Sequence, residues 1–186
     1  MHRRIGVFCG SSFGNDDSYA TVARETARTL AGAGFGIVYG GGGIGLMGVL
    51  ADAGLAAGAE VIGVIPEALA RAEAAHTGLT ELHVVESMHV RKALMADLSH
   101  GFVALPGGFG TMDELCEILS WRQLGIHDKP IGLLNHRGYY DELIALFDSM
   151  VRCGFVRSDN RALVVERDDP AELLSAMFPS REPDTA

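Results

Sequence analysis

The sequence has 186 residues, a length that fits one domain of ordinary size. Glycine accounts for 24 of them, nearly twice its usual share of roughly 7%, but the glycines follow no period and come with only 6 prolines, which excludes collagen and low-complexity disorder. The formal net charge of −9 argues against a general nucleic-acid binder, because such a protein needs a basic face to neutralise phosphates. A small anion held by a few arginines and backbone amides is compatible with this charge.

Lysine is scarce, since Lys92 and Lys129 are the only two. Neither follows a GxxxxGK[ST] loop, so a P-loop is excluded, and a Schiff-base enzyme would have two candidates only. The three cysteines, Cys9, Cys116 and Cys153, show no CxxC spacing and are expected to be buried, reduced thiols. The chain shows no secretory signal pattern and no apolar run near the roughly 18 residues that span a membrane. We therefore expect a soluble, cytoplasmic protein.

Short apolar runs alternate with stretches of helical spacing along the chain. The predicted strands cover residues 5–9, 36–39, 61–65, 82–85, 102–105, 131–134 and 163–165. The predicted helices cover residues 18–33, 46–58, 87–99, 112–124, 139–153 and 170–178. Because each strand is a continuous apolar run, the pattern predicts an α/β sandwich of three layers, with a mostly parallel sheet of about six or seven strands covered by helices on both faces. One domain is expected over 1–178, followed by a polar, frayed tail over 179–186.

A first glycine cluster follows the second predicted strand, where parallel sheets bind ligands. This cluster, Gly40–Gly48, contains a literal GxGxxG, and Gly41, Gly42, Gly43 and Gly45 are candidates for a phosphate loop. A packing role is the alternative. The dinucleotide fingerprint belongs to the first strand–helix turn, with an acid about 20 residues further on. The cluster does not match that context, so NAD binding is disfavoured.

A second glycine cluster, Pro106–Glu114 (PGGFGTMDE), follows the fifth predicted strand. Its loop amides could hold a phosphate, with the Thr111 hydroxyl as an added donor. The alternative is structural: Thr111 and Glu114 have the spacing of a capping box for a helix that begins at Thr111. Glu117, one turn further on, is expected on a solvated helix face.

A third segment, Met88–Lys92, places several cations at the start of a predicted helix. His89 and Lys92 share one helix face, whereas Arg91 points elsewhere, beside Met88 and Met95. An exposed basic patch is the ordinary interpretation. Cations in a first helical turn oppose the helix dipole, however, which is typical of a site that needs positive charge. Five further histidines show no metal-ligand spacing, and no metal is predicted; they are His76, His83, His100, His127 and His136.

Together these segments resemble the LOG family, the cytokinin-activating phosphoribohydrolases, many of which carry the label "lysine decarboxylase-like". The resemblance covers residues 5 to about 157, and its most specific part is the combination of MHVRK with PGGFGTMDE. The matching stretches are Val7–Ser12, Val38–Gly48, Gly63–Pro66, Met88–Met95, Leu105–Glu114, and Leu124–Pro130 on to Tyr139 and Tyr140.

The resemblance implies a Rossmann-like fold, a homodimer with sites near the subunit interface, and hydrolysis of the N-glycosidic bond of nucleoside 5′-monophosphates. The products are a free base and ribose 5-phosphate, N6-substituted adenines are the preferred bases, and no cofactor is needed. It implies catalytic roles for Arg91 and Glu114. It implies substrate contacts from Glu73, Met88, Arg91, Lys92, Gly107, Gly108, Phe109, Gly110, Thr111, Met112, Asp113, Glu114 and Ser120.

The chain departs from the family pattern at a few positions without losing a catalytic residue. Asp113 stands where glutamate is usual and Ser120 where threonine is common, and both keep their functional group. Phe109 stands where tyrosine is common, and His100 follows Ser99 where aspartate is common. The loss of a hydroxyl at Phe109 is expected to alter substrate preference.

Two alternatives stay open beside the hydrolase. A non-enzymatic carrier of a nucleotide-like ligand could use the same fold and would bind without releasing a base. An NAD-dependent oxidoreductase would need the loop Gly43–Gly48 to face a pyrophosphate. A PLP-dependent lysine decarboxylase is disfavoured, because Lys92 and Lys129 lie in unconvincing contexts for a Schiff base.

Overall fold

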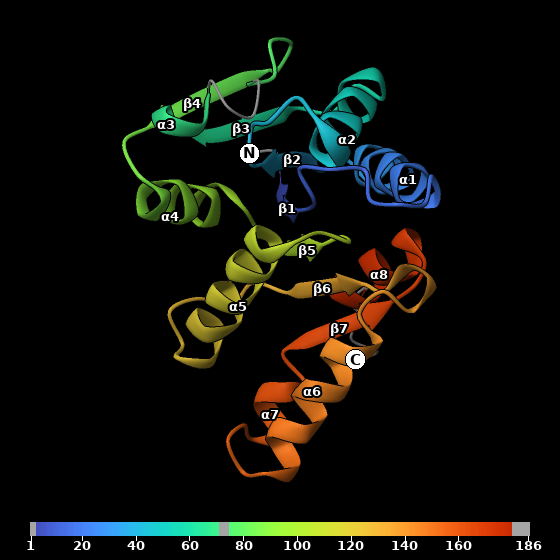
Figure 1. Ribbon diagram of the computed structural model, residues 1–186, viewed down its shortest axis with the longest axis vertical. Coiled ribbons are helices and arrows are strands. Elements are labelled where there is room, and N and C mark those ends of the chain that lie inside the picture. Colours follow the sequence, from blue (N-terminus) through green and yellow to red (C-terminus); the bar gives the residue numbers. More distant parts are fainter. Residues whose placement is uncertain (1–2, 71–74, 180–186) are drawn as a thin grey trace, which may run out of the picture.

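The computed structural model describes residues 3–70 and 75–179, and these contain a seven-stranded sheet in which every pairing is parallel (Figure 1). The strand order is β4-β3-β2-β1-β5-β6-β7. The strands are β1 (Arg4–Phe8), β2 (Gly36–Tyr39), β3 (Val61–Pro66), β4 (Glu81–Val85), β5 (Phe102–Ala104), β6 (Ile131–Leu134) and β7 (Val164–Arg167). The predicted fold class is confirmed.

Helices cover both faces of this sheet. The helices are α1 (Ser18–Gly32), α2 (Gly45–Ala56), α3 (Glu67–Ala70), α4 (Met88–Leu98), α5 (Phe109–Gln123), α6 (Asp141–Arg152), α7 (Ser158–Arg161) and α8 (Pro170–Met177), with a 3-10 turn η1 (His136–Gly138). Helices α3, α7 and η1 were not predicted, because three or four residues are too short to show a helical period. No described helix is long and apolar enough to cross a membrane.

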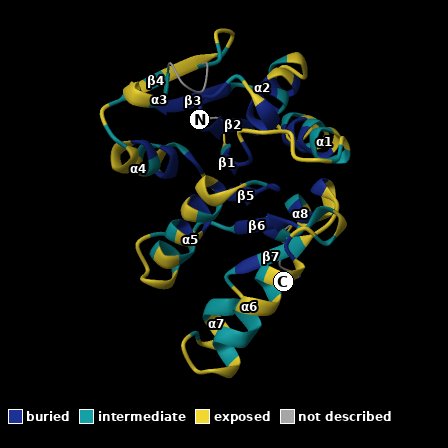
Figure 2. Ribbon diagram, in the orientation of Figure 1, coloured by how far each residue is buried: buried dark blue, intermediate teal, exposed yellow. Residues whose placement is uncertain are grey.

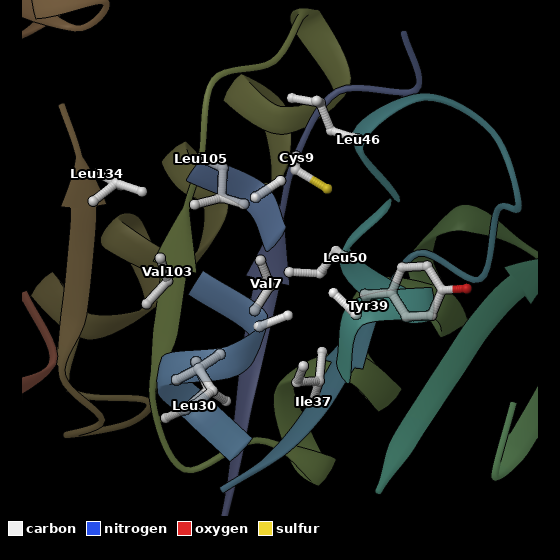
Figure 3. Packing of buried hydrophobic residues seen from close by; sticks show 14 of the residues in the cluster. Val7, Cys9, Leu30, Ile37, Tyr39, Leu46, Leu50, Val103, Leu105 and Leu134 are labelled. Atoms are coloured by element: carbon white, nitrogen blue, oxygen red, sulfur yellow. The ribbon is translucent and has the colours of Figure 1, made fainter. Parts of the chain in front are cut away.

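Each face of the sheet has its own apolar core. Neighbouring residues of β1 illustrate this: Val7 packs with Leu30 and Leu50 under α1 and α2, whereas Phe8 packs with Met95 under α4 and α5. Figure 3 shows the first of these clusters around β1. Because successive strand residues point to opposite faces and both faces are buried, a central strand must be apolar throughout. This explains the continuous apolar runs in the sequence.

Two predictions about burial are wrong in part. Strand β4 lies at the sheet edge, and its residue Val84 is 57% exposed, so this strand is not a buried run (Figure 2). Among the cysteines only Cys9 is buried; Cys116 on α5 and Cys153 at the end of α6 are exposed, and all three are free. The apolar content of a segment did not reveal that one side of it faces solvent.

The strand order creates a switch point between β1 and β5. The chain builds outward from β1 to β4 and then returns to the other side of β1 with β5. The turns after these two strands are therefore neighbours, and the Gly10 amide donates a hydrogen bond to the Pro106 carbonyl at 3.1 Å. The Leu46 amide at the start of α2 donates to the Gly10 carbonyl, also at 3.1 Å. Ligands of open α/β sheets bind at such a point.

Candidate active site

A cavity of about 160 Å³ opens at this switch point. Its wall combines the turn after β1, the first glycine cluster, helix α4 and the start of α5. The lining residues are Val7, Cys9, Gly10, Ser11, Gly40, Met47, Arg91, Gly108, Phe109, Gly110, Thr111 and Glu114. Six of the residues predicted for the site therefore share one cavity: Arg91, Gly108, Phe109, Gly110, Thr111 and Glu114. We call it the Arg91–Glu114 cavity.

Arg91 is buried and fixed from several sides. Its Nε donates a hydrogen bond to the Val64 carbonyl at 3.0 Å, and its Nη2 donates to the Gly40 carbonyl at 3.2 Å. Its Nη1 lies 3.4 Å from Oε1 of Glu114. A Cβ at Gly40 would overlap the guanidinium, which gives a steric reason for glycine there. The Arg91 side chain points into the protein. This agrees with the prediction that Arg91 lies on a different helix face from His89 and Lys92.

Glu114 approaches Arg91 from the second turn of α5. The helix begins at Phe109 with Gly108 as its N-cap, so Thr111 is the third helical residue. The capping-box alternative is therefore wrong, because the N-cap is Gly108, three residues before Thr111. A glycine N-cap has no side chain to accept from the first amides of the helix, and these amides stay available to an anion.

Lys92 forms a second bridge between the same two helices. Its Nζ lies 3.0 Å from Asp113 Oδ2 and 3.1 Å from Glu117 Oε1, so consecutive residues of α4 pair with α5. Burial disfavours the charged amine, but the hydrogen bonds to both carboxylates outweigh it and raise the pKa of Lys92. Glu117, which was expected on a solvated helix face, is 24% exposed, and Lys92 neutralises its charge.

The first glycine cluster contributes to the cavity mainly through Gly40. Gly41 has a φ of +77° and packs against Ile65. The Gly42 carbonyl accepts a hydrogen bond from the Tyr39 hydroxyl at 3.2 Å. Gly45 has a φ of +62°, and a Cβ there would overlap the Ser11 backbone. Gly41 and Gly45 are therefore needed for close packing. A phosphate loop formed by Gly41, Gly42, Gly43 and Gly45 stays a prediction.

The other predicted site residues lie around the cavity or away from it. Met88 Sδ lies 3.8 Å from Arg91 Nη1, and Met112 packs against the core beneath α4 and α5. Ser120 donates to the Cys116 carbonyl at 2.8 Å and lines a different cavity, of about 220 Å³, between α5, α6 and α7. Gly107 lines a neighbouring cavity of about 200 Å³. Glu73 lies outside the described residues.

Comparisons with known proteins show the family of the chain. The family model described as "Possible lysine decarboxylase" matches residues 47–177. A relative from Oryza sativa subsp. japonica, named "Probable cytokinin riboside 5'-monophosphate phosphoribohydrolase LOGL1", is 49% identical over 94% of this chain and 78% of its own. The Arabidopsis thaliana protein "Cytokinin riboside 5'-monophosphate phosphoribohydrolase LOG1" is 46% identical over 94% of this chain and 82% of its own.

The chain belongs to the LOG family. Solved structures agree on the fold of this LOG family member. The Moco carrier protein from Chlamydomonas reinhardtii has a TM-score of 0.69 at 22% identity, covering 95% of both chains. The molybdenum cofactor binding protein from Rippkaea orientalis has a TM-score of 0.71 at 18% identity, covering 95% of this chain and 96% of its own. At such identities the likeness concerns the fold alone.

The two lysines of this LOG protein do not suit the decarboxylase description of its family model. Lys92 is held by two carboxylates of α5. Lys129 precedes β6, at the amino end of the sheet, and its Nζ donates to the Ala96 carbonyl at 2.6 Å. Burial lowers the pKa of Lys129, but the Arg91–Glu114 cavity lies at the opposite, carboxyl end of the strands. The described residues also hold no group of three or more His, Cys, Asp or Glu side chains that could bind a metal.

Sequence reasoning missed the turn after β1, which supplies Cys9, Gly10 and Ser11 to the cavity. The available signal was that this turn follows a strand at its carboxyl end, but only the strand order reveals that β1 adjoins β5. Burial, and to a lesser degree the charge of Glu114, strongly raises the pKa of the Cys9 thiol. Cys9 is thus a neutral wall of the cavity.

Proposed function

We propose that this LOG protein hydrolyses the N-glycosidic bond of N6-substituted adenosine 5′-monophosphates, releasing the free base and ribose 5-phosphate. The observation that carries the proposal is the buried Arg91–Glu114 pair at the switch point, beside the uncapped start of α5. The names of relatives at 46% and 49% identity support the substrate class.

Glu114 suits the chemistry at the ribose. Breaking an N-glycosidic bond builds positive charge on the sugar, as in glycoside hydrolysis. A largely buried carboxylate such as that of Glu114 stabilises this charge strongly, and it also orients a water molecule toward C1′. In the balanced reaction, the water oxygen bonds to C1′, the bond from C1′ to the base nitrogen breaks, and a water proton ends on the base.

Arg91 acts through its charge rather than as a proton donor, because an arginine pKa exceeds about 12. Its guanidinium holds the 5′-phosphate or stabilises negative charge on the departing base. Its hydrogen bonds to the Val64 and Gly40 carbonyls fix it in place before the substrate arrives. No reorganisation is then needed during the reaction.

The 5′-phosphate is assigned to the start of α5. The first amides of a helix carry a partial positive charge and attract anions. Gly108, Gly110 and Thr111 line the same cavity. Phe109 is 96% exposed, beside this phosphate site. Substrate contacts from Glu73, Met88, Lys92, Gly107, Met112, Asp113 and Ser120 are proposed from the family resemblance.

We also propose a cytoplasmic homodimer with sites near its interface. Helix α6 supports this, because it carries apolar side chains although no residue within it is fully buried. Leu146 on α6 is half exposed, and Phe155 just beyond the helix is exposed. Light scattering coupled to size-exclusion chromatography tests this: a mass of two chains is expected, and a mass of one chain contradicts it.

The activity is tested by incubating the purified protein with AMP and with isopentenyl-AMP and measuring free base by chromatography. Release of base with matching amounts of ribose 5-phosphate is expected, with isopentenyl-AMP as the better substrate. Tight binding without release would indicate the carrier alternative instead. A rise in nicotinamide fluorescence on titration with NADH would favour the oxidoreductase.

A further inference from the structure

The carbonyl groups of the turn between β5 and α5 are all engaged by donors. The four consecutive carbonyls belong to residues 105–108. The first accepts a hydrogen bond from the Tyr140 hydroxyl at 2.6 Å, and the second accepts from the Gly10 amide at 3.1 Å. The third accepts from the Tyr139 hydroxyl at 2.6 Å, and the fourth accepts from the Met112 amide at 3.1 Å. Two tyrosines from the segment before α6 therefore hold a turn that lies in another part of the sequence.

Tyr139 controls one peptide plane of this turn. The carbonyl of Gly107 and the amide of Gly108 belong to the same trans peptide, so they point in opposite directions. Glycines flank this plane on both sides, and glycine admits a wide range of backbone angles. A Cβ at Gly107 would overlap Thr111, so the first glycine of the plane is closely packed, whereas a Cβ at Gly108 would meet nothing within 4 Å. The hydroxyl of Tyr139 is the group that binds the carbonyl of this plane.

The turn separates two cavities. On one side lies the Arg91–Glu114 cavity, and on the other lies the neighbouring cavity lined by Phe13, Tyr19, Tyr139 and Gly107, among others. Gly108 lines both. Since the Gly107 carbonyl is bound on the Tyr139 side, the Gly108 amide faces away from Tyr139.

We propose that Tyr139 is a positioning residue for phosphate recognition: its hydroxyl turns the Gly107 carbonyl away from the Arg91–Glu114 cavity and presents the Gly108 amide to the phosphate. If the plane turned over, a carbonyl oxygen would face the anion and repel it. The tyrosine ring is itself placed by edge-to-face contacts with Tyr19 and Tyr140, at 5.8 Å and 4.8 Å between centroids. The inference rests on the proposed phosphate site at the start of α5.

The test is Tyr139→Phe, which removes the hydroxyl and keeps the ring. Tyr139 is 42% exposed, so the variant is expected to fold. We expect KM for isopentenyl-AMP to rise about tenfold with kcat changed by less than about twofold. The reason is that the lost hydrogen bond orients the Gly108 amide, which binds the phosphate. Hydrolysis of the corresponding riboside, which lacks the phosphate, should not change. Tyr19→Phe is the matched control, and it should behave as the wild type does.

Calorimetric titration with ribose 5-phosphate separates this inference from the proposed activity. If the wild type binds ribose 5-phosphate about tenfold more tightly than Tyr139→Phe but releases no base, the positioning role stands and the proposed activity falls. If the wild type releases base and both proteins bind ribose 5-phosphate equally, the positioning role is overturned. It is also overturned by a loss of kcat at unchanged KM, by an equal loss on nucleotide and riboside, or by a wild type that does not bind ribose 5-phosphate. Because titration is run below the unfolding transition, a lower melting temperature of the variant would not affect the comparison.

Discussion

Arg91 Nη1 and Glu114 Oε1 lie 3.4 Å apart, and their side chains are only 8% and 9% exposed. Burying two charges costs several kcal/mol per ion, and their mutual attraction offsets this only when further hydrogen bonds are made. The Val64 and Gly40 carbonyls supply such bonds to Arg91. A buried pair is weak evidence for a stabilising role, so its place in a ligand cavity is better explained by the chemistry we propose.

Replacing Arg91 alone should destabilise the protein strongly. Arg91→Met leaves the Glu114 carboxylate buried without its cation, which costs about 3 kcal/mol in the free energy of unfolding. Urea denaturation measures this. The double variant Arg91→Met/Glu114→Gln should be more stable than the sum of the two single losses predicts, and strict additivity would show that the pair is not coupled.

The outer bridge of Lys92 should contribute less, and its contribution should depend on salt. Lys92 is 11% exposed, but its partners Asp113 and Glu117 are 57% and 24% exposed, so solvent weakens the bridge. Lys92→Met should lower the free energy of unfolding by about 1 kcal/mol at low salt. At about 1 M salt the loss should shrink, because exposed charges are then screened. A loss that does not change with salt would contradict a bridge of this kind.

Gly45 should not tolerate a side chain. Its φ of +62° is unfavourable for other residues, and a Cβ would overlap the Ser11 backbone. Gly45→Ala should lower the free energy of unfolding by about 2 kcal/mol or more. Gly32, at the end of α1, is the matched control, because a Cβ there meets nothing within 4 Å. Equal effects of Gly32→Ala and Gly45→Ala on the melting temperature would refute the packing argument.

His127 should make the protein less stable in mild acid. Its Nε2 lies 3.0 Å from the Ile118 carbonyl and its Nδ1 accepts from the Lys129 amide at 3.2 Å, an arrangement that suits the neutral ring. Burial, and further the charges of Lys129 and Arg122, lower the pKa of His127 against the opposing effects of the Ile118 hydrogen bond and Asp128.

The unfolded chain therefore takes up a proton on His127 before the folded chain does. Stability should be full above the unfolded pKa of about 6.5 and should fall as the pH drops below it. Gln can donate and accept in the same way without titrating, so His127→Gln should reduce the loss of melting temperature between pH 7.5 and pH 5.5. An unchanged loss would show that His127 is not responsible.

The sequence predicted much of this fold because its signals are local. Buried central strands such as β1 and β2 are continuous apolar runs, and glycines mark the turns that follow them. The start of α5 was misplaced because Thr111 and Glu114 have the sequence spacing of a capping box, although Gly108 is the N-cap. The contribution of Cys9, Gly10 and Ser11 to the cavity depends on which strands are neighbours. The exposure of β4 depends on its position at the edge of the sheet. Neither property can be predicted from a local sequence pattern.

Glu114→Gln tests the central claim most directly. The substitution keeps the size of the side chain and removes its charge, and circular dichroism at low temperature confirms that the variant is folded. The quantity to measure is the rate of free base released from isopentenyl-AMP at saturating substrate, for wild type and variant side by side. The account predicts a loss of kcat of about a hundredfold or more, because the carboxylate stabilises charge that forms only in the transition state. Turnover equal to that of the wild type would remove Glu114 from the mechanism and contradict the account.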